Sequence, residues 1–205
     1  MFPILIIENA EPFLSEWLRA EYKHSALHWE NEVWITNLGQ DAIKGLEKLQ
    51  MKNLKLFSKH CWDVIKKGNV LILDPQGDKI IEKSDLDFAD FVIVGGILGE
   101  KVMKGRTKKK ITDKFLDNLG NMDGKVNIKV VNLGKYHFPI DQAVIFCEKL
   151  YKGEKIEIIE DPEFVLESKE NMKRVVSLPY AYIKEGEKIL ISNELMDLLK
   201  KGFPI

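Results

Sequence analysis

Glycines and polar residues follow three apolar segments of the chain, and residues of these types can surround a small ligand. The segments read "LILDPQGD" at residues 71–78, "FVIVGGILGE" at 91–100 and "VVNLGK" at 130–135. Glycine lets a ligand approach the backbone closely, although a tight turn explains any single glycine equally well. Ligands of open α/β sheets bind at the carboxyl ends of the strands. Three such ends therefore predict one shared crevice.

The residues between the glycines indicate which ligand would fit. "GGILG" is not the G-x-G-x-x-G pattern of a dinucleotide fold, and the chain lacks the G-x-x-x-x-G-K-[ST] pattern of a phosphate loop. A phosphate-binding loop is therefore disfavoured. Ile97 and Leu98 instead place apolar walls beside backbone polar groups. We interpret this loop as a site for a flat, uncharged ring such as adenine.

The elements that would position these strand ends alternate between strand and helix. Runs rich in Ile and Val predict strands buried on both faces, as in a mostly parallel sheet. Apolar residues at helical spacing predict helices between them. The predicted strands are residues 4–8, 33–38, 69–74, 91–94 and 126–131, and the predicted helices hold residues 13–22, 42–49, 111–119 and 140–150. This alternation predicts an α/β fold.

Helix boundaries follow from local signals. Pro12 suits a first helical turn, and Thr107 suits an N-cap. Gly120 and Gly153 suit positions just past helix ends. Residues 155–191 hold short extended pieces and residues 192–201 a last helix. We predict one domain, residues 1–205, with 155–205 as a C-terminal extension packed on it.

Composition limits the class of protein. Hydrophobic residues make up 45% of the chain and charged residues 31%, and the formal net charge is -1. This balance argues against coating of nucleic acid by overall charge. No apolar run reaches the length of a membrane span, and the N-terminus lacks the pattern of a signal peptide. We expect a cytoplasmic protein without a membrane partner.

Cysteines and histidines suggest no metal site. Cys61 and Cys147 lie in apolar helical stretches, which predicts two buried thiols in a reducing compartment. The four histidines form no recognisable ligand spacing, so we predict no metal. His24 and His28 lie four apart, and we expect an exposed helical pair. His137 stands out because it lies in the third of the glycine-containing loops.

Several stretches together resemble the SPOUT-class methyltransferases. They are "IIENAEPFLSEWLRAEY", "LILDPQGD", "FADFVIVGGILGE" with "GRTKK", and "EDPEF" followed by "LPYAYI", and residues 74–107 are the most specific part. Within this class the chain is similar to a small branch first described as predicted RNA methyltransferases, whose eukaryotic member methylates an arginine of a small-subunit ribosomal protein. The resemblance covers most of the chain.

The resemblance implies a SPOUT-like parallel sheet with helices on both faces and a C-terminal trefoil knot. It also implies S-adenosylmethionine bound within the knot's loops, with residues 95–99 and 132–138 around the adenosine. The implied cofactor-binding residues are Asp74, Gly95, Gly96, Ile97, Leu98, Gly99, Asn132, Leu133, Gly134 and Ala143.

An arginine acceptor adds a requirement to methyl transfer, because its guanidinium must lose a proton as the new bond forms. The candidate carboxylates are Glu8, Glu11 and Asp141, although each is also explained as a solvated strand-end or helix-end charge. We predict Glu8 and Asp141 as catalytic, because both lie at strand-to-helix transitions, and Glu11 as substrate-binding.

A basic run follows the glycine loop at residues 101–110. It is either a solvated surface or a contact with ribosomal or substrate RNA. We predict Arg106 and Lys108 as substrate-binding, although Arg106 equally suits a cofactor or structural role.

Three functions remain open. The leading one is methylation of an arginine on a ribosomal protein or small subunit. It is favoured by the near-neutral net charge and because the helix start at residues 139–143 lacks the Ser-x-Asn of many RNA-modifying SPOUT enzymes. RNA methylation by the same fold is the second, and a non-catalytic assembly factor that binds the cofactor is the third. We expect a monomer, with a homodimer as the alternative.

Overall fold

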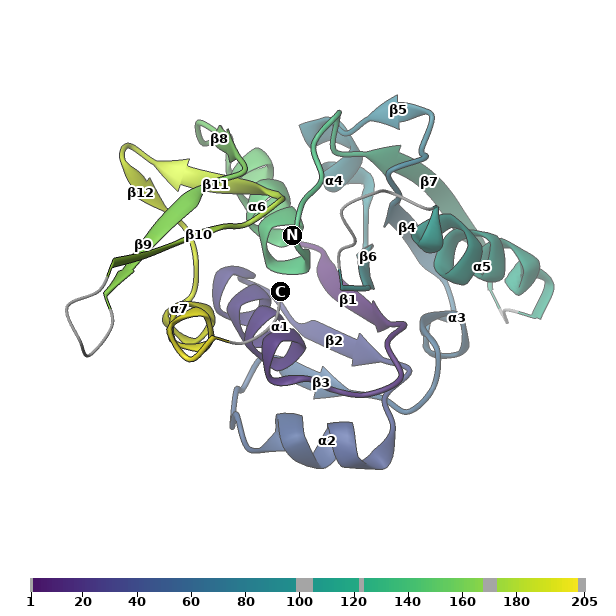
Figure 1. The fold of residues 1–205 in the computed structure, drawn as a ribbon. Coiled ribbons are helices and arrows are strands. Elements are labelled where there is room, and N and C mark those ends of the chain that lie inside the picture. Colours follow the sequence, from purple (N-terminus) through teal and green to yellow (C-terminus); the bar gives the residue numbers. More distant parts are fainter. Residues whose placement is uncertain (1, 99–104, 122–123, 168–172, 203–205) are drawn as a thin grey trace.

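A seven-stranded sheet forms the centre of the computed structural model, which describes residues 2–98, 105–121, 124–167 and 173–202 (Figure 1). The strand order is β3-β2-β1-β6-β4-β7-β5, and all neighbouring strands are parallel. The strands are β1 Ile4–Asn9, β2 Val33–Thr36, β3 Leu54–Leu56, β4 Gly68–Leu73, β5 Lys79–Ile80, β6 Phe91–Gly96 and β7 Val126–Asn132. The predicted α/β fold with a mostly parallel sheet is confirmed.

Helices cover both faces of this sheet. Leu5 and Ile7 of β1 belong to a core cluster with residues of α1 (Glu16–His28) and α6 (Ile140–Lys152), whereas Ile6 belongs to a separate cluster with residues of α3 (Cys61–Val64) and α5 (Asp113–Asp117). This alternation follows from the two-residue period of a strand. All three residues are fully buried, as predicted for a strand covered on both faces. The remaining helices of the sheet region are α2 Gln40–Glu47 and α4 Lys83–Phe88.

Two predicted helix starts are wrong. Helix α1 begins after Ser15, whose Oγ accepts a hydrogen bond from Leu18 N at 3.1 Å, so Pro12 lies before the helix. Thr107 has helical backbone angles and makes no side-chain cap, because a π-helical turn, Lys108–Thr112, follows it and continues into α5. Helix α5 ends before Gly120, which lies in a 3-10 turn, Leu119–Asn121. Gly153 ends α6 with φ 71°, as predicted.

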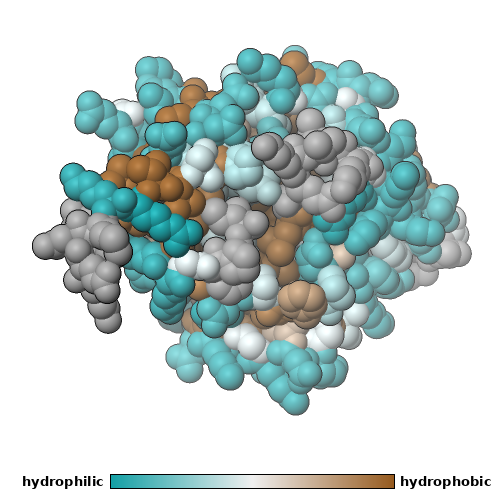
Figure 2. Space-filling view, in the orientation of Figure 1, coloured by the Kyte–Doolittle hydropathy of each residue, from teal (hydrophilic) through white to brown (hydrophobic). Residues whose placement is uncertain are grey.

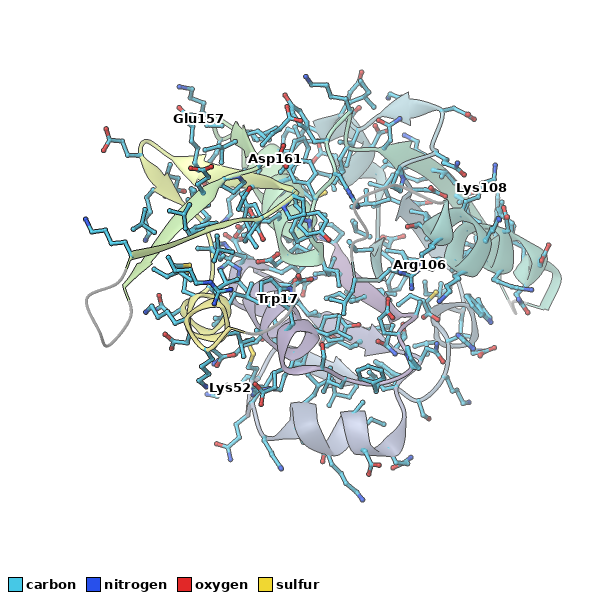
Figure 3. All side chains as sticks on the ribbon, viewed as in Figure 1. Trp17, Lys52, Arg106, Lys108, Glu157 and Asp161 are labelled. Carbon is cyan, nitrogen blue, oxygen red and sulfur yellow. The ribbon has the colours of Figure 1, made fainter. Side chains whose placement is uncertain are left out.

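The C-terminal part forms two small antiparallel sheets and a helix. One sheet has the order β12-β11-β8 and the other pairs β10 with β9. The elements are β8 Glu157–Glu160, β9 Glu163–Glu167, β10 Lys173–Ser177, β11 Ala181–Glu185, β12 Lys188–Ile189 and α7 Asn193–Lys200. Trp17 of α1 packs in one cluster with Tyr182 and Leu195, and Figure 3 labels it at α1.

The face of the molecule shown in Figure 2 is mostly hydrophilic, with a hydrophobic patch over the small sheets. Val165 and Val175, which pair directly across β9 and β10, are 60% and 56% exposed. Within the described ranges, no helix is both long and apolar enough to cross a bilayer. The threading of the predicted trefoil knot does not follow from strand order, so the knot stays a prediction.

Candidate active site

A cavity of about 380 Å³ lies at the carboxyl ends of β4 and β6 and beside the loop after β7. This is the crevice that the three strand ends predict. Its lining residues are Leu73, Asp74, Pro75, Gln76, Val94, Gly95, Ile97, Leu98, Gly105, Arg106, Thr107, Leu133, Gly134, Tyr136, His137, Phe138, Ile140 and Ala143.

Most of the predicted cofactor-binding residues lie in this cavity. Those in its lining are Asp74, Gly95, Ile97, Leu98, Leu133, Gly134 and Ala143. Gly96 and Asn132 lie next to lining residues but are not part of the lining. Gly99 lies outside the residues that the structure describes.

The two glycines that end β6 have separate reasons to be glycine. A Cβ on Gly95 would meet Ile111 Cδ1 at 3.0 Å. A Cβ on Gly96 would meet the Tyr22 hydroxyl oxygen at 2.4 Å and the backbone of Asn9 at 3.0 Å. Gly96 is therefore explained by close packing of β6 against β1 and α1, whereas Gly95 also faces the cavity.

Asn132 shapes the loop that covers the cavity. Its Oδ1 accepts a hydrogen bond from Gly134 N at 2.8 Å, and its Nδ2 donates to Gly77 O at 2.6 Å. Gly134 has φ 84°, a conformation that glycine adopts without strain. Asn132 thus links the turn after β4 to the loop after β7 and holds the backbone of Gly134 beside the cavity.

Asp74 forms the polar wall at the end of β4. Its Oδ2 accepts a hydrogen bond from Thr112 Oγ1 at 2.6 Å, and its Oδ1 accepts one from Gln76 N at 2.9 Å. The side chain is buried, so both bonds lie largely out of water. They fix the turn that carries Gln76 into the cavity lining.

Glu11 and Arg106 close one side of the cavity. Arg106 Nη2 donates to Glu11 Oε1 at 2.9 Å, and Arg106 Nη1 donates to Leu98 O at 3.2 Å. Leu98 N donates to the same Glu11 Oε1 at 3.0 Å. Two of the predicted substrate-binding residues are thereby brought together at the cavity's edge.

The predicted catalytic Glu8 lies outside the cavity lining. Its carboxylate is 1% exposed and faces α3, where it accepts hydrogen bonds from Thr36 Oγ1 at 2.6 Å and Cys61 N at 2.9 Å and contacts His60 Nδ1 at 2.7 Å. This geometry favours a structural role. The catalytic role stays a prediction.

The predicted catalytic Asp141 also lies behind the cavity rather than in its lining. It is fully buried, and its Oδ2 lies 2.7 Å from His24 Nδ1. The expectation of an exposed histidine pair is wrong, because α1 packs against α6 and buries His24 to 8% exposure. His28 lies 3.2 Å from Glu148.

A second buried carboxylate, Glu21, lies beside Asp141. Glu21 accepts hydrogen bonds from Trp17 Nε1 at 2.7 Å and from Ile140 N, at the start of α6, at 3.3 Å. Burial, and next the negative charge of Asp141, raise the pKa of Glu21 to about 8. Helix α6 starts after Pro139, which offers no side-chain cap, and Glu21 supplies an acceptor there from another helix.

Lys108 points away from the site. It is exposed, and Figure 3 shows it on the outer side of the molecule, whereas Arg106 lies towards the middle. Lys110 donates from Nζ to Ala10 O at 3.0 Å. Lys101 and Lys104 of the basic run lie outside the described residues.

The loop at residues 132–138, predicted to surround the adenosine, also brings Tyr136 and Phe138 into the lining. Sequence reasoning gave no cofactor role to two further lining residues, Gln76 and Thr107. Gln76 lies in the turn after β4, so its position was the available signal, whereas Thr107 lies in the helical start before α5. His137, singled out from the sequence, does line the cavity, and burial lowers its pKa. Its ring contacts Tyr180 of the C-terminal part at 5.2 Å.

The cavity suits a nucleoside with an attached polar chain. Leu98, Leu133 and Phe138 supply apolar surface for a ring, and Gln76, Thr107 and Arg106 supply hydrogen-bonding groups. The volume falls within the range of small-molecule sites. Among the described residues, no group of three His, Cys, Asp or Glu side chains is arranged to hold a metal ion.

Comparison with known proteins agrees with this geometry. Residues 4–204 match the family described as "Protein arginine N-methyltransferase SFM1-like". Protein arginine N-methyltransferase SFM1 of Saccharomyces cerevisiae is 28% identical over 96% of this chain and 93% of its own length.

Two solved structures are similar to the fold. The crystal structure of yeast arginine methyltransferase SFM1 complexed with SAM has a TM-score of 0.79 and 25% identity, covering 98% of this chain and 92% of its own. Dual-specific Trm10 of Thermococcus kodakaraensis has a TM-score of 0.52 and 17% identity, covering 75% of this chain and 95% of its own, which is a likeness of fold alone.

Proposed function

The chain belongs to the family of SFM1-like protein arginine N-methyltransferases, and from this premise we propose that it methylates an arginine side chain of a ribosomal protein, with S-adenosylmethionine as donor. The observation that carries the proposal is the cavity, which joins an apolar ring site to the Glu11 carboxylate at its edge.

The lining residues divide between the parts of the donor. Leu98, Leu133 and Phe138 offer the adenine its apolar contacts, and Gln76 and Thr107 offer hydrogen bonds to the polar remainder. When bound, the donor supplies an activated methyl group on a sulfonium. The chain itself aligns the acceptor nitrogen and excludes water, which are the main requirements of this reaction.

Glu11 is suited to hold the acceptor. Both of its hydrogen bonds, from Leu98 N and Arg106 Nη2, fall on Oε1. Within the described parts of the chain, no hydrogen bond reaches Oε2, so this oxygen can accept from a substrate guanidinium. In the reaction the bond from sulfur to the methyl carbon breaks, a bond from the guanidinium nitrogen to that carbon forms, and the guanidinium releases a proton. The products are S-adenosylhomocysteine and N-methylarginine.

RNA methylation is the second candidate, carried by one observation. Lys108, Lys109 and Lys110 form an exposed basic run close to the cavity. A phosphate backbone would bind such a run, with an affinity that falls steeply as salt increases.

Labelling separates these functions. The protein is incubated with methyl-labelled S-adenosylmethionine and unmethylated small ribosomal subunits, and the label is divided between protein and RNA. We expect the label in protein, recovered as methylarginine. Label in RNA would establish the second candidate, and cofactor binding without transfer would leave a non-catalytic assembly factor.

We also propose a monomer that works in the cytoplasm. The C-terminal part covers Trp17 and Ala20 of α1, apolar surface that a second subunit would otherwise be needed to bury. The two free thiols, Cys61 and Cys147, are buried and unpaired with each other, which suits a reducing compartment. Sedimentation at micromolar concentration is expected to give 23.6 kDa, and twice that mass would establish a dimer.

A further inference from the structure

A second, larger hollow lies next to the cavity. It has a volume of about 1020 Å³ and is formed by the segment between β1 and α1, the start of α1 and the start of α2. Residues that matter for its chemistry are Glu11, Phe13, Glu16, Asn37, Gly39 and Asp41. We call this hollow the α1–α2 groove. Its volume is at the upper limit of small-molecule sites, so it has room for a polypeptide segment.

The groove and the cavity meet at Glu11. Glu11 lines the groove, and its Oε1 binds Leu98 N and Arg106 Nη2, both of which belong to residues that line the cavity. The two hollows therefore share one wall, and Glu11 Oε2, which accepts no hydrogen bond from the residues that the structure describes, belongs to that wall. A side chain that reaches this oxygen from the groove would end beside the cavity.

The floor of the groove is held in one conformation. Asn9 Nδ2 donates to Asn37 O at 3.2 Å, and Asn37 Nδ2 donates to Asn9 O at 2.7 Å. Tyr22 Oη donates to Asn9 Oδ1 at 2.8 Å. Asn37 adopts φ 58°, an uncommon conformation outside glycine that persists where its surroundings fix it. These bonds join the ends of β1 and β2, so the groove is preformed.

The groove's side chains favour a basic and partly apolar occupant. Phe13 is 72% exposed and offers an aromatic surface. Three carboxylates, Glu11, Glu16 and Asp41, line the groove with two cations, Arg19 and Lys110. Glu11 is paired with Arg106 at 2.9 Å, Asp41 with Lys44 at 3.9 Å, and Lys110 with Ala10 O. Carboxylates outnumber cations in the lining by one, so the lining favours arginine or lysine next to an apolar residue over a phosphate group.

We propose that the α1–α2 groove binds the substrate polypeptide as an extended, basic segment, with the target guanidinium at Glu11 Oε2 and a neighbouring apolar residue on Phe13. This inference rests on the proposed function, because it names where the substrate of that reaction lies. It assigns substrate selection to the loop after β1 and to the start of α2.

A groove-filling variant tests the proposal. Gly39 lines the groove at φ -69°, and a Cβ there meets no atom within 4 Å, so Gly39→Trp fits without strain and occupies the groove. We expect the KM for the ribosomal protein to rise at least tenfold, with unchanged affinity for S-adenosylmethionine. Gly120→Trp is the matched control, since Gly120 is equally open and lies in the turn after α5. Its KM is expected to stay at the wild-type value.

A charge variant gives a second, independent measurement. The Asp41 side chain is fully exposed, so Asp41→Lys leaves folding intact while reversing a groove charge. We expect the KM to rise several-fold at low salt and less at high salt, with Asp117→Lys on α5 as control. A KM within twofold of wild type for both Gly39→Trp and Asp41→Lys would overturn the groove and leave the proposed function standing. Failure of the wild type to form methylarginine would instead overturn the proposed function.

Discussion

Glu8 is an acidic residue at a strand end, a position that suggests catalysis, but its carboxylate is bound by structural partners. Its parity along β1 is that of Ile6, so its carboxylate faces α3, whereas the cavity lining from α6 lies on the face of Leu5 and Ile7. The sequence shows this two-residue alternation, but not which face carries the site. Asp74 and Gly95 were predictable as lining residues because they lie at the carboxyl ends of their strands. The face to which the Glu8 side chain points depends instead on which helix covers each face of the sheet.

We predict that Glu8→Gln lowers stability rather than turnover. The amide replaces one of two carboxylate oxygens that together receive bonds from Thr36, Cys61 and His60, so a buried partner loses its acceptor. The expected loss is about 1–3 kcal/mol in the free energy of unfolding, measured by urea denaturation. A large fall in kcat, measured on fully folded variant with normal cofactor affinity, would restore the catalytic role.

Glu21 predicts a dependence of stability on pH. Its pKa of about 8 lies above the 4.5 of an unfolded chain, because burial and Asp141 favour the neutral acid. The stability that the neutral acid contributes is therefore fully present below pH 4.5 and is lost as pH rises through 8. Tyr182 also faces this group, and burial and then Asp141 raise the pKa of Tyr182, whereas His24 contacts the neighbouring Asp141.

The expected result is a fall of a few kcal/mol in the free energy of unfolding between pH 5 and pH 8. Glu21→Gln cannot ionise, so its unfolding free energy should fall less over this interval. Urea denaturation at several pH values measures both curves. Parallel curves for wild type and variant would show that Glu21 does not titrate in this interval.

At the scale of elements, the start of α1 depends on one hydroxyl. Ser15 Oγ accepts from Leu18 N, and removing an N-cap of this kind typically costs about 1 kcal/mol. Ser15→Ala should therefore lower the free energy of unfolding by that amount, whereas Ser15→Asp should retain most of it. Equal stability of all three proteins in urea would mean that water replaces the cap.

Elements were predictable where periodicity is long and strong, and their ends were less so. Strands β3 and β5 were missed because three and two residues carry too little periodic signal. The π-helical turn before α5 was missed because no local residue signals it, and the buried side chains of Ile111 and Phe115 hold it in place through tertiary packing. Glu21 accepts the hydrogen bond from Ile140 N at the start of α6, but it lies far from Ile140 in the sequence. No residue near Pro139 therefore indicates this cap.

At the scale of the whole molecule, we predict that residues 155–205 are required for the rest to fold. Gln142 of α6 donates to Leu190 O at 2.7 Å and accepts from Ile183 N at 2.9 Å, and Trp17 is covered by the same part of the chain. A chain of residues 1–154 would expose that tryptophan and remove both of these bonds, so that Gln142 Oε1 loses its donor and Nε2 keeps only the 3.2 Å bond to Asp141 Oδ2. We expect loss of cooperative thermal unfolding and binding of a hydrophobic dye. Cooperative unfolding of this shortened chain would instead establish two independent units.

The central place of β1 in the sheet also sets an order of events during synthesis. One side of β1 pairs with β2, which follows soon in the chain, but the other side pairs with β6 from Phe91 onwards. At about 5–20 residues per second, the ribosome needs roughly 4–16 s to move from Asn9 to Phe91. Throughout that interval a strand whose first four residues are apolar presents an open hydrogen-bonding edge, the kind that recruits other chains. The nascent protein thus depends longest on protection at its first strand.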